Sequence, residues 1–98
     1  LHQDAQTDPL TGALNRRSGF RKLEGWLNEG GAFSLLAVDV KRFKEVNDVH
    51  GHNIGDEVLK LIAQTLQESV REDDLVIRQG GDEFLVATKG TPEPLVER

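Results

Sequence analysis

Three carboxylates in two short stretches are the residues whose types and spacing could do chemistry. Asp39 lies near the end of the apolar run FSLLAVDV, and Asp82 and Glu83 directly follow two glycines in VIRQGGDEFLVAT. An ionised carboxylate among buried valines is costly unless it is paired, hydrogen-bonded or bound to a metal ion. If the two stretches lie side by side, Asp39, Asp82 and a backbone carbonyl would form an oxygen-rich site suited to Mg²⁺.

Each of these features also has a purely structural explanation. Asp39 could end a strand and cap a helix that begins at Lys41. The two glycines could simply make an exposed hairpin turn, in which they adopt positive φ angles. In the functional alternative, Gly80 and Gly81 remove side chains where a ligand or a second subunit approaches. Strand alternation would send the two acids that follow to opposite faces.

The strands that must position these acids can be read from hydrophobic runs. FSLLAVDV is short and almost continuously apolar, which predicts a central strand buried on both faces. LVIR and EFLVAT predict the two strands of a hairpin, joined by a tight turn. Because open α/β sheets bind ligands at the carboxyl ends of strands, Asp39 falls where a ligand is expected.

Helices are expected around these strands. RSGFRKLEGWLNEGG places Phe20, Leu23 and Leu27 on one helical face and ends at a Gly-Gly pair, which suits a helix C-terminus. KRFKEVND predicts a short helix closed by VHGHNIG, and DEVLKLIAQTLQESV predicts the clearest amphipathic helix. TPEPLVER resembles a helix start, with Thr91 as N-cap and Pro92 in the first position.

The length and element order predict one α/β domain that is cut short. A chain of 98 residues suffices for one small domain. We expect residues 1–7 to be the end of an upstream linker or signalling helix. Since a helix start follows an exposed hairpin at the end of the sequence, residues 8–98 are expected to be the N-terminal part of a domain whose C-terminal portion, with at least one strand, is absent.

Composition and motif spacing exclude several function classes. A net charge of −5 argues against binding a nucleic-acid backbone, so a phosphorylated ligand would need metal ions or local basic residues. The sequence lacks a long apolar run and a signal-peptide pattern, so no direct membrane contact is expected from this segment. Cysteine is absent, which leaves no thiolate metal site and fits a reducing compartment.

Three common ligand motifs also fail. The P-loop pattern G-x-x-x-x-G-K-[ST] does not occur. NDVHGHNIGDE is not a calcium loop, because aligning either glycine puts Val46 or His50 at the first ligand position. His50 and His52 lack a third soft or imidazole ligand at a spacing suitable for zinc.

Three separated motifs together resemble one known family. DPLTGALNRR, DVKRFKEVNDVHGHNIGDEVL and RQGGDEF occur in the order and spacing of the GGDEF family of diguanylate cyclases, and the resemblance covers residues 8–88. It implies a ferredoxin-like α/β sheet with flanking helices, similar to the palm of nucleotide polymerases. It also implies a homodimer that condenses two GTP molecules into cyclic di-GMP and releases pyrophosphate, each 3′-hydroxyl attacking the α-phosphate of the other GTP.

The resemblance assigns catalytic and metal-binding roles to the acids. Asp39 and Asp82 would bind Mg²⁺ or Mn²⁺ through their carboxylates, and Val40 through its carbonyl. Glu83 would assist at the metal site or help to deprotonate the 3′-hydroxyl. The metal ions would neutralise phosphate charge and align in-line attack.

A second set of residues is implied to hold GTP: Phe43, Lys44, Asn47, Asp56, Gly80 and Gly81. Asn47 and Asp56 would hydrogen-bond the guanine edge, because an amide offers a donor and an acceptor while a carboxylate accepts from guanine N–H groups. Phe43 would lie near the base, and Lys44 and the backbone around Phe43 would hold phosphates. The glycines would leave room for the α-phosphate and for the partner's GTP.

REDD, residues 71–74, is by itself an ordinary charged loop after a helix. It also matches the family's inhibitory R-x-x-D site, with five residues before Gly80. Arg71 presents a fork suited to guanine and phosphate, and Asp74 can accept from guanine N–H groups. The resemblance therefore implies inhibition by bound cyclic di-GMP.

Lys41 departs from the pattern of many family members, which carry an acidic residue there. Asp39 is retained, so metal binding should persist with altered local charge or GTP affinity. Without the family's C-terminal basic residues, the 98-residue chain itself is expected to be inactive. The alternative function is a catalytically silent module that binds GTP or cyclic di-GMP and regulates a partner domain. In either case we expect a cytoplasmic domain that follows a sensory or regulatory domain in the parent protein. A region upstream of this chain could anchor that protein to a membrane.

Overall fold

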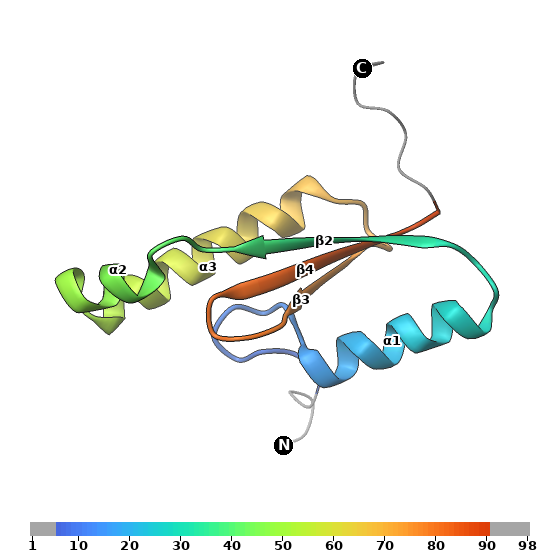
Figure 1. Cartoon of the computed structure of the whole chain (residues 1–98), viewed down its shortest axis with the longest axis horizontal. Coiled ribbons are helices and arrows are strands. Elements are labelled where there is room, and N and C mark those ends of the chain that lie inside the picture. The colour runs from blue at the N-terminus through green and yellow to red at the C-terminus, as the bar shows by residue number, and fades with distance from the viewer. Residues whose placement is uncertain (1–5, 91–98) are drawn as a thin grey trace, which may run out of the picture.

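The computed structural model of the chain describes residues 6–90 (Figure 1). Their elements are β1 Leu14–Asn15, α1 Arg16–Asn28, β2 Phe33–Asp39, α2 Phe43–His50, α3 His52–Ser69, β3 Leu75–Arg78 and β4 Glu83–Lys89. The helix start expected at Thr91 and Pro92 lies outside the described residues, as does most of the expected upstream segment.

The strands form one sheet in the order β1-β3-β4-β2. The inner strand β4 pairs antiparallel with both β3 and β2, while the short β1 runs parallel to β3. This confirms the expected hairpin, and it meets the condition that the hairpin lies beside the strand that carries Asp39. Helix α1 lies on one side of the sheet, and α3 lies on the other (Figure 1).

The two faces of the sheet carry separate clusters of buried residues. The cluster between α3 and the sheet consists of Ala13, Leu59, Ala63, Val76, Phe84 and Val86. The cluster between α1 and the sheet consists of Leu23, Ile77 and Ala87. Successive strand residues point to opposite faces, which explains why neighbours such as Val76 and Ile77 join different clusters. Helix α1 can approach β3 closely because Gly19 has no side chain, and a Cβ there would lie 2.5 Å from Cγ1 of Ile77.

Helix α1 ends where the sequence predicts. Gly30 follows the last turn with a φ of +80°, and its N–H donates to the carbonyl of Leu27 over 2.9 Å. Of the three apolar residues expected on one face, Leu23 is buried, whereas Phe20 and Leu27 are exposed. The expected face is therefore only partly covered within residues 6–90.

Two predictions about the other elements are wrong. The segment VHGHNIG is not a loop, because α3 already begins at His52 and only Gly51, with a φ of +89°, separates it from α2. Strand β2 is an edge strand among the described residues rather than a central one. Its Leu35 and Leu36 are 51% and 61% exposed, because α1 packs mainly over β1 and β3 and α3 packs mainly over β3.

Candidate active site at the paired ends of β2 and β4

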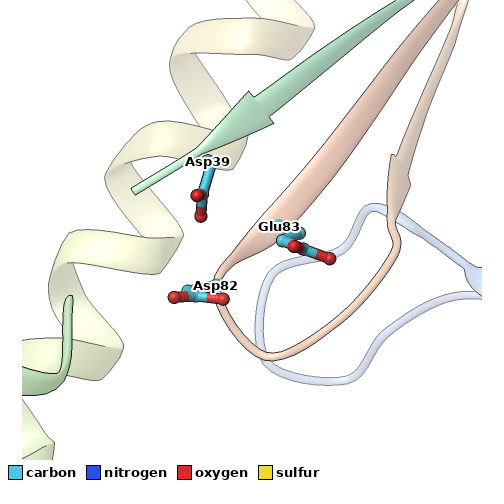
Figure 2. A group of neighbouring side chains, drawn as sticks. All are labelled: Asp39, Asp82 and Glu83. Atoms are coloured by element: carbon cyan, nitrogen blue, oxygen red, sulfur yellow. The ribbon is translucent and has the colours of Figure 1, made fainter. Parts of the chain in front are cut away.

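The register between β2 and β4 brings the three acids together. Asp39 pairs with Glu83 across the two strands, and the N–H of Val40 donates to the carbonyl of Asp82 over 3.1 Å. Each carboxylate offers an oxygen within 4.8 Å of the others. Figure 2 shows Asp39 pointing from the end of β2 toward Asp82, in the loop that leads into β4.

This geometry corrects two expectations about the acids. Asp82 and Glu83 do not diverge to opposite faces, because Asp82 precedes β4 and strand alternation does not apply to it. Asp39 is exposed, so the cost of burying its charge is not the reason for a metal site. Asp39 also does not cap α2, whose N-cap is Arg42, with a φ of +60° and no side-chain cap hydrogen bond.

The Gly-Gly segment is not the tight positive-φ turn expected from sequence. Neither Gly80 nor Gly81 has a positive φ, and the connection from β3 to β4 spans residues 79–82. The N–H groups of Gln79 and Gly80 both donate to the carbonyl of Glu83, over 2.8 and 3.2 Å. A Cβ on Gly81 would meet open space in the described chain, so this glycine lies where another molecule could approach.

Sequence analysis missed a set of residues that holds this loop in place. The guanidinium of Arg78 donates to the carbonyls of Gly80 and Gly81, over 3.3 and 2.8 Å, and also binds the carboxylate of Asp8. Asp8 accepts from the N–H and hydroxyl of Thr11, both over 2.9 Å. Burial by itself would raise the pKa of Asp8, but the hydrogen bonds from Thr11 and Arg78 and the charge of Arg78 lower it below 3.8.

Apart from Gly80 and Gly81, the residues expected to bind the nucleotide come from α2 and α3. Phe43 and Asn47 are half-buried on α2, Asp56 is half-buried on α3, and Lys44 is exposed. Within residues 6–90, the buried Oδ1 of Asn47 accepts no hydrogen bond. A buried acceptor without a partner is costly, and it suits a ligand that brings an N–H group.

The three carboxylates also fit a hard divalent cation. Carboxylate oxygens are the ligands that Mg²⁺ prefers, and an exposed cluster leaves room for the waters and phosphates that complete its coordination shell. Two of the acids, Asp39 and Glu83, are exposed, and Asp82 is half-buried. The donor set therefore fits the metal that the sequence suggests.

Arg71 and Asp74 lie at the opposite end of the hairpin, just before β3. Two hydrogen bonds join them in a turn. The N–H of Arg71 donates to Oδ2 of Asp74 over 2.8 Å, and the N–H of Asp74 donates to the carbonyl of Arg71 over 3.1 Å. Both residues line an open hollow of about 340 Å³, together with Lys22 of α1. The structure thus places the expected inhibitory pair together and away from the acids.

Comparison with known proteins decides the family. The model of the family described as "Diguanylate cyclase, GGDEF domain" matches residues 5–97. The chain belongs to the GGDEF family. Its four-stranded mixed sheet and three helices, counted over residues 6–90, match solved GGDEF structures, which confirms the expected fold class.

Similar proteins include a diguanylate cyclase and a response regulator, both much longer than this chain. The diguanylate cyclase DgcM of Escherichia coli K12 is 43% identical over 96 residues, covering 94% of this chain and 23% of DgcM. The response regulator PleD of Caulobacter vibrioides is 43% identical over 91 residues, covering 89% of this chain and 20% of PleD. The chain thus spans less than a quarter of the length of these two relatives.

Solved structures of GGDEF proteins are also similar to this chain. The GGDEF domain of DgcB from Caulobacter crescentus, in complex with c-di-GMP, has a TM-score of 0.85 and 28% identity, covering 98% of this chain and 57% of that one. The diguanylate cyclase SiaD of Pseudomonas aeruginosa, in complex with its activator SiaC, has a TM-score of 0.77 and 42% identity, covering 87% of this chain and 34% of SiaD.

No helix among residues 6–90 of this GGDEF chain is long and apolar enough to cross a membrane.

Proposed function

We propose that the protein containing this chain is a diguanylate cyclase, which condenses two GTP molecules into cyclic di-GMP and releases pyrophosphate. The observation that carries the proposal is the convergence of Asp39, Asp82 and Glu83 at the paired ends of β2 and β4, in a chain of the GGDEF family. The activity requires each 3′-oxygen to form a bond to the α-phosphorus of the other GTP while the bond from that phosphorus to the pyrophosphate breaks.

The acids would provide the metal site. Asp39 and Asp82 would hold Mg²⁺ or Mn²⁺ through carboxylates and Val40 through its carbonyl, and the bound metal would supply charge neutralisation at the phosphates. Glu83 would accept or orient the proton that leaves the 3′-hydroxyl, since it is exposed beside the other two acids. The open space beside Gly81 would admit the α-phosphate.

Guanine would be recognised between α2 and α3. The unpartnered Oδ1 of Asn47 supports this role, because a buried acceptor is satisfied only when a ligand donor reaches it. Asp56 would accept from the guanine N–H groups, and the exposed Lys44 would approach the phosphates. Phe43 of α2 is half-buried against the cluster that contains Leu59 and Phe84, and it would border the base.

Two further parts of the proposal concern assembly and regulation. One subunit would hold one GTP, so turnover requires a homodimer, whose formation an upstream sensory or regulatory domain would control. Cyclic di-GMP would bind at Arg71 and Asp74 and inhibit turnover, because a guanidinium and a carboxylate there line an open hollow. The proposed location of this domain is the cytoplasm.

The test is a product assay on the intact protein, freed of bound nucleotide. GTP and Mg²⁺ should give cyclic di-GMP and pyrophosphate, and chelation of the metal should stop both. GTP binding without any product, from a confirmed dimer, would favour a silent regulatory module instead and would direct attention to Lys41.

A further inference from the structure

Gly55 lies in the first turns of α3 and faces α2. It is buried, and a Cβ at this position would collide with Oδ1 of Asn47, besides lying 2.9 Å from Cγ of Asn47 and 3.3 Å from Cζ of Phe43. Two side chains of α2 therefore occupy the space that any side chain at position 55 would need. Packing this tight does not tolerate an added methyl group without movement of a neighbour.

The amide of Asn47 is held at Gly55 by packing rather than by hydrogen bonding. The N–H of Gly55 is already used in the helix, where it donates to the carbonyl of Gly51 over 3.1 Å. Oδ1 of Asn47 is buried and accepts no hydrogen bond within residues 6–90. The site thus keeps a polar acceptor in place without satisfying it, which is unfavourable for the protein alone but useful for a ligand donor.

We propose that Gly55 is a positioning residue for guanine recognition, because its missing side chain sets where the Asn47 amide lies. This inference rests on the proposed function. Asp56, the next residue, belongs to the same proposed base site, so the close approach of α2 to α3 also fixes the spacing between the amide and this carboxylate. The helices are linked only through Gly51, whose N–H donates to the carbonyl of Asn47 over 2.8 Å.

The first test compares Gly55→Ala with Gly25→Ala in the intact protein. Gly25 is the matched control, because it is also a helical glycine and a Cβ there would meet open space in the described chain. Gly55→Ala should raise the KM for GTP by roughly tenfold or more, change kcat less, and reduce the preference for GTP over ATP, since the loss falls on ground-state contacts to the base. Gly25→Ala should leave all three unchanged.

A second measurement separates positioning from simple misfolding. Hydrogen exchange of α2 and α3 should show faster opening in Gly55→Ala than in the wild-type protein. In an Asn47→Ala background, adding Gly55→Ala should have little further effect, because the amide with which the new methyl group collides is gone. Such non-additive effects of the two substitutions on hydrogen exchange would support the inference without any measurement of turnover.

The outcomes that overturn the inference differ from those that overturn the function. If the wild-type protein binds GTP and Gly55→Ala binds it equally well with the same base preference, Gly55 does not position the recognition site. Equal exchange effects of Gly55→Ala with and without Asn47 would overturn it as well. If the wild-type protein binds no guanine nucleotide, the proposed function itself fails, and the role of Asn47 in base recognition fails with it.

Discussion

Nη1 of Arg78 lies 3.1 Å from Oδ1 and 3.0 Å from Oδ2 of Asp8, a residue 70 positions earlier in the chain. Both side chains are largely buried, with 19% and 17% of their surfaces exposed. The same guanidinium reaches the carbonyls of Gly80 and Gly81. Arg78 therefore connects the DPLT segment to the loop that carries Asp82, which makes the position of a proposed metal ligand depend on a distant turn.

Replacing Arg78 by lysine should destabilise the domain by roughly 1–3 kcal/mol, because one ammonium group cannot reproduce the hydrogen bonds to a carboxylate and two carbonyls. Urea unfolding followed through Trp26, the only tryptophan of the chain, measures this loss. The control is Arg42→Lys, whose pair with Glu45 spans 3.5 Å at the surface and should change stability by less than about 0.5 kcal/mol. Equal losses in the two variants would contradict a special role for Arg78.

The lowered pKa of Asp8 predicts a defined pH dependence of stability. Hydrogen bonds from Thr11 and Arg78 outweigh the effect of burial, so the folded protein holds the Asp8 proton less tightly than the unfolded chain does. The resulting stabilisation should be complete above pH 3.8 and should be lost as the pH falls through the lower pKa of the folded state. Unfolding at a series of acidic pH values, for the wild type and Asp8→Asn, measures this change.

Asp8→Asn should be less stable than the wild type near neutral pH, and the difference should shrink on acidification. Asp48→Asn, at an exposed position on α2, controls for the removal of a carboxylate. A gap between Asp8→Asn and the wild type that stays constant down to pH 2 would show that Asp8 acts through its shape and not through its charge.

Arg71→Ala tests the proposed inhibitory site. The cyclic di-GMP concentration that gives half-inhibition should rise roughly tenfold or more, because the variant loses charge-assisted hydrogen bonds to the ligand. Lys60→Ala, at an exposed cation on α3, is the control and should leave this concentration unchanged. Unaltered inhibition in Arg71→Ala would leave REDD as a solvated turn, for which the reciprocal hydrogen bonds of Arg71 and Asp74 suffice.

Sequence reasoning predicted the hairpin and the strand that ends at Asp39, because apolar runs are local patterns that indicate strands. The approach of Asp82 to Asp39 remained conditional on the hairpin lying beside this strand, and only the family resemblance implied, without that condition, that both acids serve one metal site. Sequence reasoning failed where the outcome depends on packing. An apolar run such as FSLLAVDV predicts burial on both faces, whereas α1 and α3 leave the two leucines of β2 exposed among residues 6–90.

Local sequence patterns also do not predict contacts between distant segments or the backbone angles of a loop. The pairing of Asp8 with Arg78 joins segments 70 residues apart, and no periodicity reports such a contact. The DPLT turn and an arginine just before the glycines were the only local signals. Likewise, Gly80 and Gly81 suggest positive φ angles only if the turn is short, and the longer loop across residues 79–82 removes that need.

The most direct test of the central claim is cyclic di-GMP formation from GTP and Mg²⁺ by the intact protein, by its Asp82→Ala variant and by Glu68→Ala as a control. Glu68 is an exposed carboxylate of α3 and lies outside the three-acid cluster. We predict that the wild type and Glu68→Ala form cyclic di-GMP and that Asp82→Ala forms none while still folding. Undiminished product from Asp82→Ala would contradict the proposed role of the converging acids.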